Sequence, residues 1–170
     1  VGDQLDDDAD GNFGNNGFFN PPGEGAEAAA FPTKVVSLLH ADNNIAVEGN
    51  GGITLLLRAE AVHGNVNIIA ARGDVFIEYV TATGTSGDIA ISALGGNSRL
   101  TLINANGNID IVSLQNTEVF GVVRSVNGTI DIHAQAGDVD LRAADAKIEA
   151  LGGAINLTSD LGSIYTPTMM

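Results

Sequence analysis

"GTIDIHAQAGDVDLRAADAKIEALGGAINL", residues 128–157, repeats one short pattern in which a small or turn-forming residue precedes an apolar, a polar and an apolar residue. Alternation with a period of two, bounded by Gly, Asn or Asp, is typical of short β-strands joined by tight turns. The core residues that this pattern predicts here are Ile130, Ile132, Val139, Leu141, Ile148, Ile155 and Leu157.

The same triplet of apolar, variable and apolar residues recurs over most of the chain. Triplets begin at Ile45, Ile53, Val66, Val75, Ile89, Leu100, Ile109, Val119, Ile130, Val139, Ile148, Ile155 and Ile164. Every second triplet, from Ile45 to Ile148, gives a repeat of about 20 residues. Because a repeat of this length cannot bury its own apolar face, successive coils must stack, and a parallel β-solenoid is the usual result.

Each strand is preceded by a similar corner. The units are "GNVNI" (64–68), "GDVFI" (73–77), "GDIAI" (87–91), "GNIDI" (107–111), "GTIDI" (128–132) and "GDVDL" (137–141). Glycine adopts positive φ at little cost, and Asn or Asp hydrogen-bonds the turn backbone through its side chain. We therefore expect a tight corner before every strand.

The predicted fold is all-β: a parallel β-solenoid (β-helix) of about 20 residues per coil over residues 33–170, preceded by an extended arm, residues 1–32. Residues 33–44 fit either a short helix or a first strand that ends in an Asp-Asn-Asn turn. A β-sandwich or jelly roll is the alternative, because short strands at intervals of about 8 to 12 residues also describe that class. The shared corner favours the solenoid.

These units resemble the haemagglutinin-type β-helix repeats of filamentous haemagglutinin-like secreted bacterial exoproteins, over about residues 45–164 and most closely over 64–111 and 128–157. The resemblance is architectural, in the repeat length and the glycine-led strands. It implies an extracellular, elongated adhesin or fibre stalk without catalytic residues, so no residue role carries over. The acidic arm departs from this family, and the short chain suggests a free-standing subunit or a fragment.

The charge balance bounds the possible partners. Twenty-one acidic and seven basic residues give a formal net charge of −14, which repels nucleic acid and anionic membrane surfaces. No apolar run approaches the roughly 18 residues of a membrane-spanning helix, so we expect no membrane insertion. The chain starts at Val1, which we interpret as removal of either a signal peptide or a tag. The expected location is extracellular or at the cell surface.

The arm contains one metal-binding motif, "DDDADG" at residues 6–11. Carboxylates at alternate positions before a glycine turn form the first half of an EF-hand calcium loop. The second half is missing, because position twelve of the loop is Gly17 rather than Glu, so a closing ligand must come from elsewhere. The candidate calcium ligands are Asp6, Asp8, Asp10 and Asn12, and a solvated acidic tail is the alternative.

A second, weaker metal candidate is the pair Asp110 and Asp131, with Asp140 on the next unit. These carboxylates should point outward and stack on adjacent coils, where like charges repel unless a cation or an arginine intervenes. Arg124 or Arg142 is expected to relieve the repulsion. The row is also the only place for catalysis, since some β-helix enzymes cleave polysaccharides with outward carboxylates.

The function that these features predict is non-enzymatic and structural. A solenoid has two open edges whose backbone groups invite another chain. We expect extracellular subunits that assemble head to tail into a filament or surface fibre, with the arm contacting a neighbouring subunit. The alternatives are an adhesin segment that binds a cell-surface or glycan target and, weakest, a polysaccharide-active β-helix enzyme.

Overall fold

The computed structural model describes residues 34–166, with side chains for all of them except 34–37 and 54–57. These residues form fourteen β-strands and no helix. The strands are β1 (Lys34–Ala41), β2 (Ile45–Gly49), β3 (Ile53–Ala61), β4 (Val66–Ala70), β5 (Val75–Ala82), β6 (Ile89–Ala93), β7 (Ser98–Ala105), β8 (Ile109–Ser113), β9 (Thr117–Ser125), β10 (Ile130–Ala134), β11 (Val139–Asp140), β12 (Lys147–Ala150), β13 (Ile155–Ser159) and β14 (Ile164–Tyr165).

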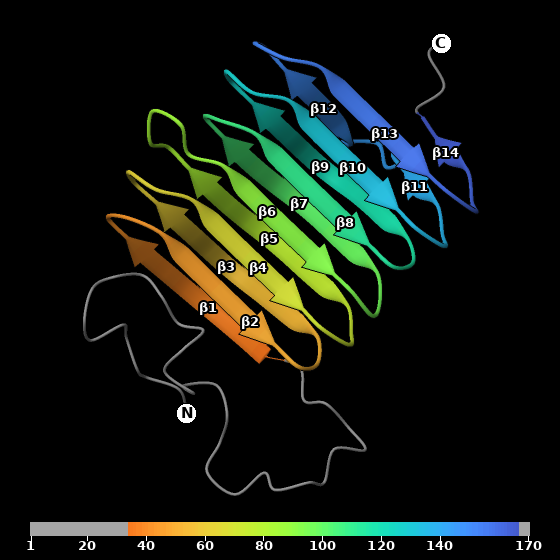
Figure 1. Cartoon of the computed structure of the whole chain (residues 1–170), viewed down its shortest axis with the longest axis horizontal. Helices are drawn as coiled ribbons and strands as arrows, with labels where there is room; N and C mark the ends of the chain where they lie inside the picture. The colour runs from red at the N-terminus through yellow and green to blue at the C-terminus, as the bar shows by residue number, and fades with distance from the viewer. Residues whose placement is uncertain (1–33, 167–170) are drawn as a thin grey trace, which may run out of the picture.

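The strands from β1 to β11 alternate between two parallel sheets that face each other (Figure 1). Sheet A has the order β13-β10-β8-β6-β4-β2, and sheet B has the order β1-β3-β5-β7-β9-β11-β14, with β12 also beside β9. Each strand therefore pairs with strands one coil away and never with its neighbour in sequence. This is a parallel β-solenoid, as predicted, and it excludes the antiparallel pairing of a sandwich. Residues 34–41 form a strand rather than the short helix that was the alternative prediction for this segment.

The register follows the predicted repeat, except near the C-terminal end. Ile109 pairs with Ile89 and with Ile130, as the every-second-triplet rule requires. The rule is wrong for the next coil, where Ile130 pairs with Ile155, and Ile148 pairs instead with Val123 of sheet B. The reason is that β11 ends at Asp140, and after a loop the chain returns to the same sheet as β12.

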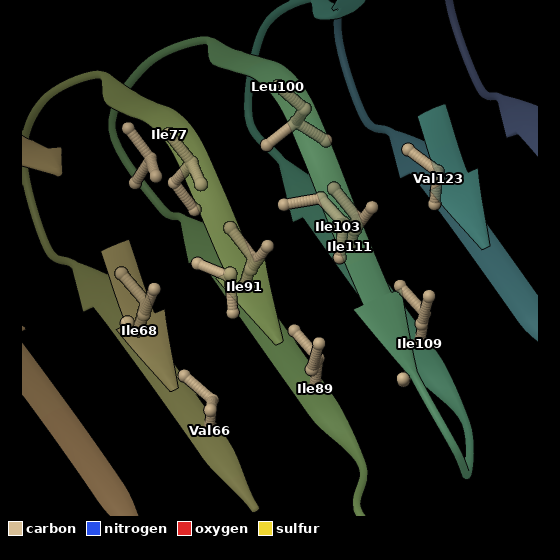
Figure 2. Packing of buried hydrophobic residues seen from close by; sticks show 14 of the residues in the cluster. Val66, Ile68, Ile77, Ile89, Ile91, Leu100, Ile103, Ile109, Ile111 and Val123 are labelled. Carbon is tan, nitrogen blue, oxygen red and sulfur yellow. The ribbon is translucent and has the colours of Figure 1, made fainter. Parts of the chain in front are cut away.

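Columns of aliphatic side chains fill the space between the sheets. Figure 2 shows Ile68, Ile91 and Ile111 stacked from coil to coil, and each is at most 1% exposed. Burying an Ile side chain contributes roughly 1.5 to 3 kcal/mol, so the columns supply most of the stabilising free energy. Of the predicted core residues at 128–157, Ile130, Ile132, Val139 and Leu141 are buried and Ile148 and Leu157 partly buried, but Ile155 is 42% exposed.

The corner glycines are required by the close stacking of coils. The expectation of positive φ is wrong for the corners quoted above, because none of their glycines lies in the left-handed region. Instead, a Cβ on Gly73 would lie 2.6 Å from the backbone nitrogen of Gly52, and one on Gly128 would lie 2.5 Å from the carbonyl carbon of Gly107. A side chain at either corner would therefore push two coils apart.

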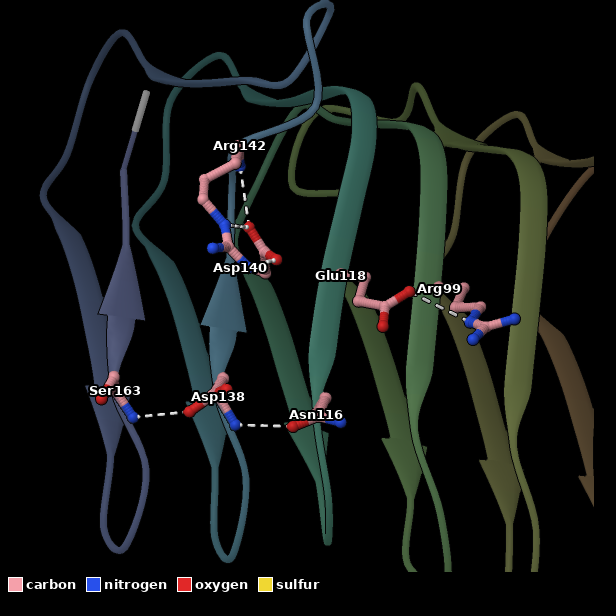
Figure 3. A network of polar contacts seen from close by, with 7 residues as sticks. All are labelled: Arg99, Asn116, Glu118, Asp138, Asp140, Arg142 and Ser163. Atoms are coloured by element: carbon pink, nitrogen blue, oxygen red, sulfur yellow. Dashed lines mark hydrogen bonds and ion pairs between the residues drawn. The ribbon is translucent and has the colours of Figure 1, made fainter. Parts of the chain in front are cut away.

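The Asn and Asp side chains at the corners accept hydrogen bonds from the next coil rather than from their own turn. At the corner before sheet A, Asn44 Oδ1 accepts a hydrogen bond of 2.8 Å from the backbone N–H of Asn65, and Asn65 Oδ1 accepts one of 2.9 Å from Asp88. The corner before sheet B repeats the arrangement, with Asn116 bonded to Asp138 and Asp138 to Ser163 (Figure 3). We call these two rows the Asx ladders. They satisfy corner N–H groups that the strands leave unpaired.

A small group of hydroxyls interrupts the aliphatic core. Ser113 Oγ donates to Ser98 Oγ at 2.8 Å and lies 2.7 Å from Thr117 Oγ1, and all three side chains are buried. Because the hydroxyls bond one another, their burial costs little free energy.

The core columns make a quantitative prediction. Ile109→Ala should lower the free energy of unfolding by about 2 to 5 kcal/mol, because it leaves a cavity inside a closed column. Ile155→Ala, at the exposed end of the same column, should cost about 1 kcal/mol or less. Urea unfolding at low protein concentration measures both. Equal costs would show that Ile155 is covered in the single subunit.

Candidate functional site

The predicted aspartate pair lies on the outer face of sheet A. Asp110 of β8 and Asp131 of β10 are register partners, as the repeat predicted. Partial burial raises the pKa of Asp110, the neighbouring charge of Asp131 raises it further, and His133 opposes both effects. Asn156 Nδ2 donates to Asp131 Oδ1 at 2.6 Å. The pair is thus a like-charge contact, and the groups beside it in sheet A are the amide of Asn156 and the imidazole of His133.

The expected arginine partners are on the other side of the molecule. Arg124 belongs to β9 of sheet B, and Arg142 follows β11 of the same sheet, so the prediction that they relieve Asp110 and Asp131 is wrong. Arg142 instead donates to Asp140, with Nε 2.9 Å from Oδ1 and Nη2 2.6 Å from Oδ2 (Figure 3). This hydrogen bond lowers the pKa of Asp140. The three aspartates therefore divide between two opposite faces.

His133 adds a titratable group beside the pair. Its Nε2 atom lies 3.0 Å from Asp160 Oδ2, but the nitrogen makes no hydrogen bond, so the contact is electrostatic and needs a protonated imidazole. Within residues 34–166, no three His, Asp or Glu side chains gather closely enough to hold a metal ion. The motif residues Asp6, Asp8, Asp10 and Asn12 lie outside the described residues, and calcium binding there stays a prediction.

The outer face of sheet B carries ion pairs and aromatic rings that the sequence analysis missed. Arg58 lies 2.7 Å from Glu60, Arg99 Nε lies 3.1 Å from Glu118, and Lys147 lies 2.6 Å from Glu149. The outward side chains with aromatic rings are Phe76, Tyr79, Phe120 and Tyr165. The alternation pattern was the signal that could have identified outward rings, because Phe76, for example, lies between the inward residues Val75 and Ile77.

The coil made by β13 and β14 exposes side chains that belong to core columns. Ile155 continues the column of Ile130, and Ile164 continues the column of Val139, yet both are 42% exposed. Leu161 at the corner between them is 81% exposed. In the middle coils the corresponding column residues are buried. Within residues 34–166, this coil, which we call the open coil, therefore presents a cross-section of the apolar core together with strand edges that have no partner.

Comparison of the chain with models of known families, with curated proteins and with solved structures finds no match. The resemblance to haemagglutinin-type repeats therefore stays a prediction. No helix long and apolar enough to cross a bilayer occurs among residues 34–166. The function must be inferred from the two outer faces and the open coil.

The Asp110–Asp131 contact predicts a pH-dependent stability. Since its raised pKa means that folded Asp110 holds its proton more tightly than the unfolded chain, stability should fall as pH rises from the ordinary value of 3.8 through the raised value. Asp110→Asn should therefore add about 0.2 to 1 kcal/mol to the free energy of unfolding at pH 7 and nothing below about pH 3.5.

Asp140→Asn is the matched control and should act in the opposite direction. The pKa of Asp140 is lowered by Arg142, so removing its charge should destabilise the fold at pH 7 and have little effect in acid. Thermal melts from pH 3 to pH 8 in EDTA measure both variants. A destabilised Asp110→Asn at pH 7 would mean that the charged carboxylate has a favourable partner.

Proposed function

We propose that the protein is a non-enzymatic, extracellular structural subunit that assembles head to tail into a filament or surface fibre. The observation that supports this proposal is the open coil of β13 and β14, whose apolar side chains and strand edges are uncovered by the rest of residues 34–166. Calcium binding by the arm and contact of residues 1–32 with a neighbouring subunit are parts of the same proposal.

The open coil favours association through the hydrophobic effect. Ile155, Ile164 and Leu161 expose apolar surface, and covering it with another coil would stabilise a junction by about 25 cal/mol for each Å² removed from water. The repeat of about 20 residues means that a coil of the same chain has the matching pattern of inward aliphatic residues. A second copy is therefore a suitable cover.

Backbone pairing gives the junction its direction. Among the described strands, β13 pairs only with β10, while β2 at the other end pairs only with β4. Each of these strands has one side without a partner in residues 34–166. Stacking the first coil of one subunit on the open coil of another would continue the parallel sheets. Such a heterologous contact does not close, so it generates a filament.

Ile155→Lys tests the end-to-end contact. The parent protein should form unbranched filaments visible by negative-stain microscopy, and the lysine should prevent them because it places a charge inside the junction. Thr158→Lys adds the same charge to an outward position of the same strand and should leave filaments intact. Filaments that are insensitive to Ile155→Lys, or a parent protein that stays one subunit long at high concentration, would contradict the proposal.

The role of the arm is tested by deletion and by chelation. Removing residues 1–32 should abolish filaments while the β-type circular dichroism spectrum remains. EDTA should have the same effect on the parent, and the variant Asp6→Asn, Asp8→Asn, Asp10→Asn should assemble poorly even with added calcium. Undiminished assembly of the deleted protein would show that the arm makes no essential contact.

A further inference from the structure

The two outer faces of the solenoid differ in aromatic content. The described aromatic side chains, Phe76, Tyr79, Phe120 and Tyr165, all lie in strands of sheet B, and none lies in sheet A. Phe120 is 45% exposed and Phe76 is 37% exposed. Aromatic rings are enriched in protein interfaces, because they bury a large apolar area and lose little conformational entropy.

The faces also differ in charge. The strands of sheet A contain Glu48, Asp110 and Asp131 but no Lys or Arg. Among the described side chains, the strands of sheet B contain four basic residues, Arg58, Arg99, Arg124 and Lys147, and five acidic residues, Glu60, Glu78, Glu118, Asp140 and Glu149. Because the whole chain has a net charge of −14, two copies repel each other wherever their acidic surfaces meet. The outer face of sheet B, where basic and acidic side chains nearly balance, is the strand face that reduces this repulsion.

The charges and rings of sheet B form columns along the solenoid axis, read from the register of β5, β7, β9, β11 and β12. One column contains Phe76, Arg99, Glu118 and Asp140; the next contains Tyr79, Leu102, Val122 and Lys147; the third contains Thr81, Asn104, Arg124 and Glu149. In each column the residues of β7 and β9 are central.

We propose that the outer face of sheet B pairs with the same face of a second copy, about a two-fold axis that runs parallel to the strands midway between β7 and β9. This axis places each column opposite the same column of the partner, with the order of its residues reversed. In the first column, Arg99 faces the partner's Glu118, and Glu118 faces the partner's Arg99. Figure 3 shows that these two side chains lie on the same outer face as Asp140.

The other columns are self-complementary under the same axis. Leu102 faces the partner's Val122, which brings two half-buried aliphatic side chains together. Tyr79 faces the partner's Lys147, a cation–π arrangement. The loop after β11 comes to lie over the partner's β5, where Arg142 faces the partner's Glu78. No like charges are opposed in the three columns, whereas pairing of two sheet A faces would oppose carboxylates.

The area that the axis brings together lies at the lower end of the range for specific dimers. The axis overlaps six strand levels, from β3 to β14, and six levels about 4.8 Å apart with central strands of eight or nine residues rising about 3.3 Å each give roughly 24 Å by 26 Å. A face of roughly 620 Å² for each partner is about 1,240 Å² in total, against the ~1,200 to 2,000 Å² of a standard interface. The pairing is lateral and closed, so it is separate from end-to-end assembly.

Charge exchange between two variants tests the pairing. Every protein in the experiment is the full chain carrying Ile155→Lys, which removes end-to-end contacts. The result therefore does not depend on whether the unmodified chain forms filaments. Arg99→Glu opposes two acidic residues across the dimer, and Glu118→Arg opposes two arginines. Each variant alone should dimerise at least about tenfold more weakly than the parent in sedimentation velocity at low salt. Mixing the two variants should restore the dimer, because each supplies the charge that the other needs.

Restoration by mixing distinguishes a contact between subunits from the Arg99–Glu118 ion pair within one subunit. Each variant loses that internal pair, and mixing cannot restore it. Ser92→Glu, on the outer face of sheet A, is the matched control and should dimerise like the parent. A parent that stays monomeric, single variants that dimerise as well as the parent, or a mixture no more dimeric than its components would overturn the proposal. If the parent stays monomeric and binds an uncharged polysaccharide through Tyr79, the face is a glycan-binding surface rather than a dimer interface. That result would also overturn the proposal.

Discussion

The close contact between consecutive corners is the constraint on which the rest of the molecule depends. Strand pairing sets the spacing between coils, and the corners must fit within that spacing without side chains at Gly73 or Gly128. The Asx ladders then join one corner to the next through backbone N–H groups. With corners fixed in this way, every inward residue lies directly above its counterpart, and columns of Ile, Val and Leu pack without any aromatic side chain in the described core.

Regular stacking also explains why both faces and the open coil have distinct properties. Successive strands of a sheet are in register, so outward residues at equivalent positions line up as a column on the surface. Sheet A carries small and acidic residues at these positions, and sheet B carries aromatic and paired charged residues. At the coil of β13 and β14 the described strands end, and Ile155 has no neighbour among them like the one that covers its counterpart Ile130.

The sequence was sufficient to predict the solenoid, the repeat length and the stacking of Asp110 on Asp131, because all three depend on local alternation and spacing. It failed where the chain departs from the repeat. The triplet at Ile148 has the usual pattern, but only the short strand β11 and the loop after it place this residue on sheet B instead of sheet A. The same failure put Arg142 beside the wrong aspartates. Periodicity gives the residues of a column but does not identify which sheet holds them once a coil is lengthened.

The Asx ladders have a further consequence for which substitutions the corners tolerate. The backbone N–H groups of the ladders bond to side-chain Oδ1 atoms, and both Asn and Asp supply this oxygen, as Asn65 and Asp88 do in one ladder. Exchange of Asn for Asp at such a position keeps the accepting oxygen and so preserves the hydrogen bond between coils. A side chain without that oxygen would leave a corner N–H group without its acceptor, which makes these positions selective for an oxygen atom rather than for a charge.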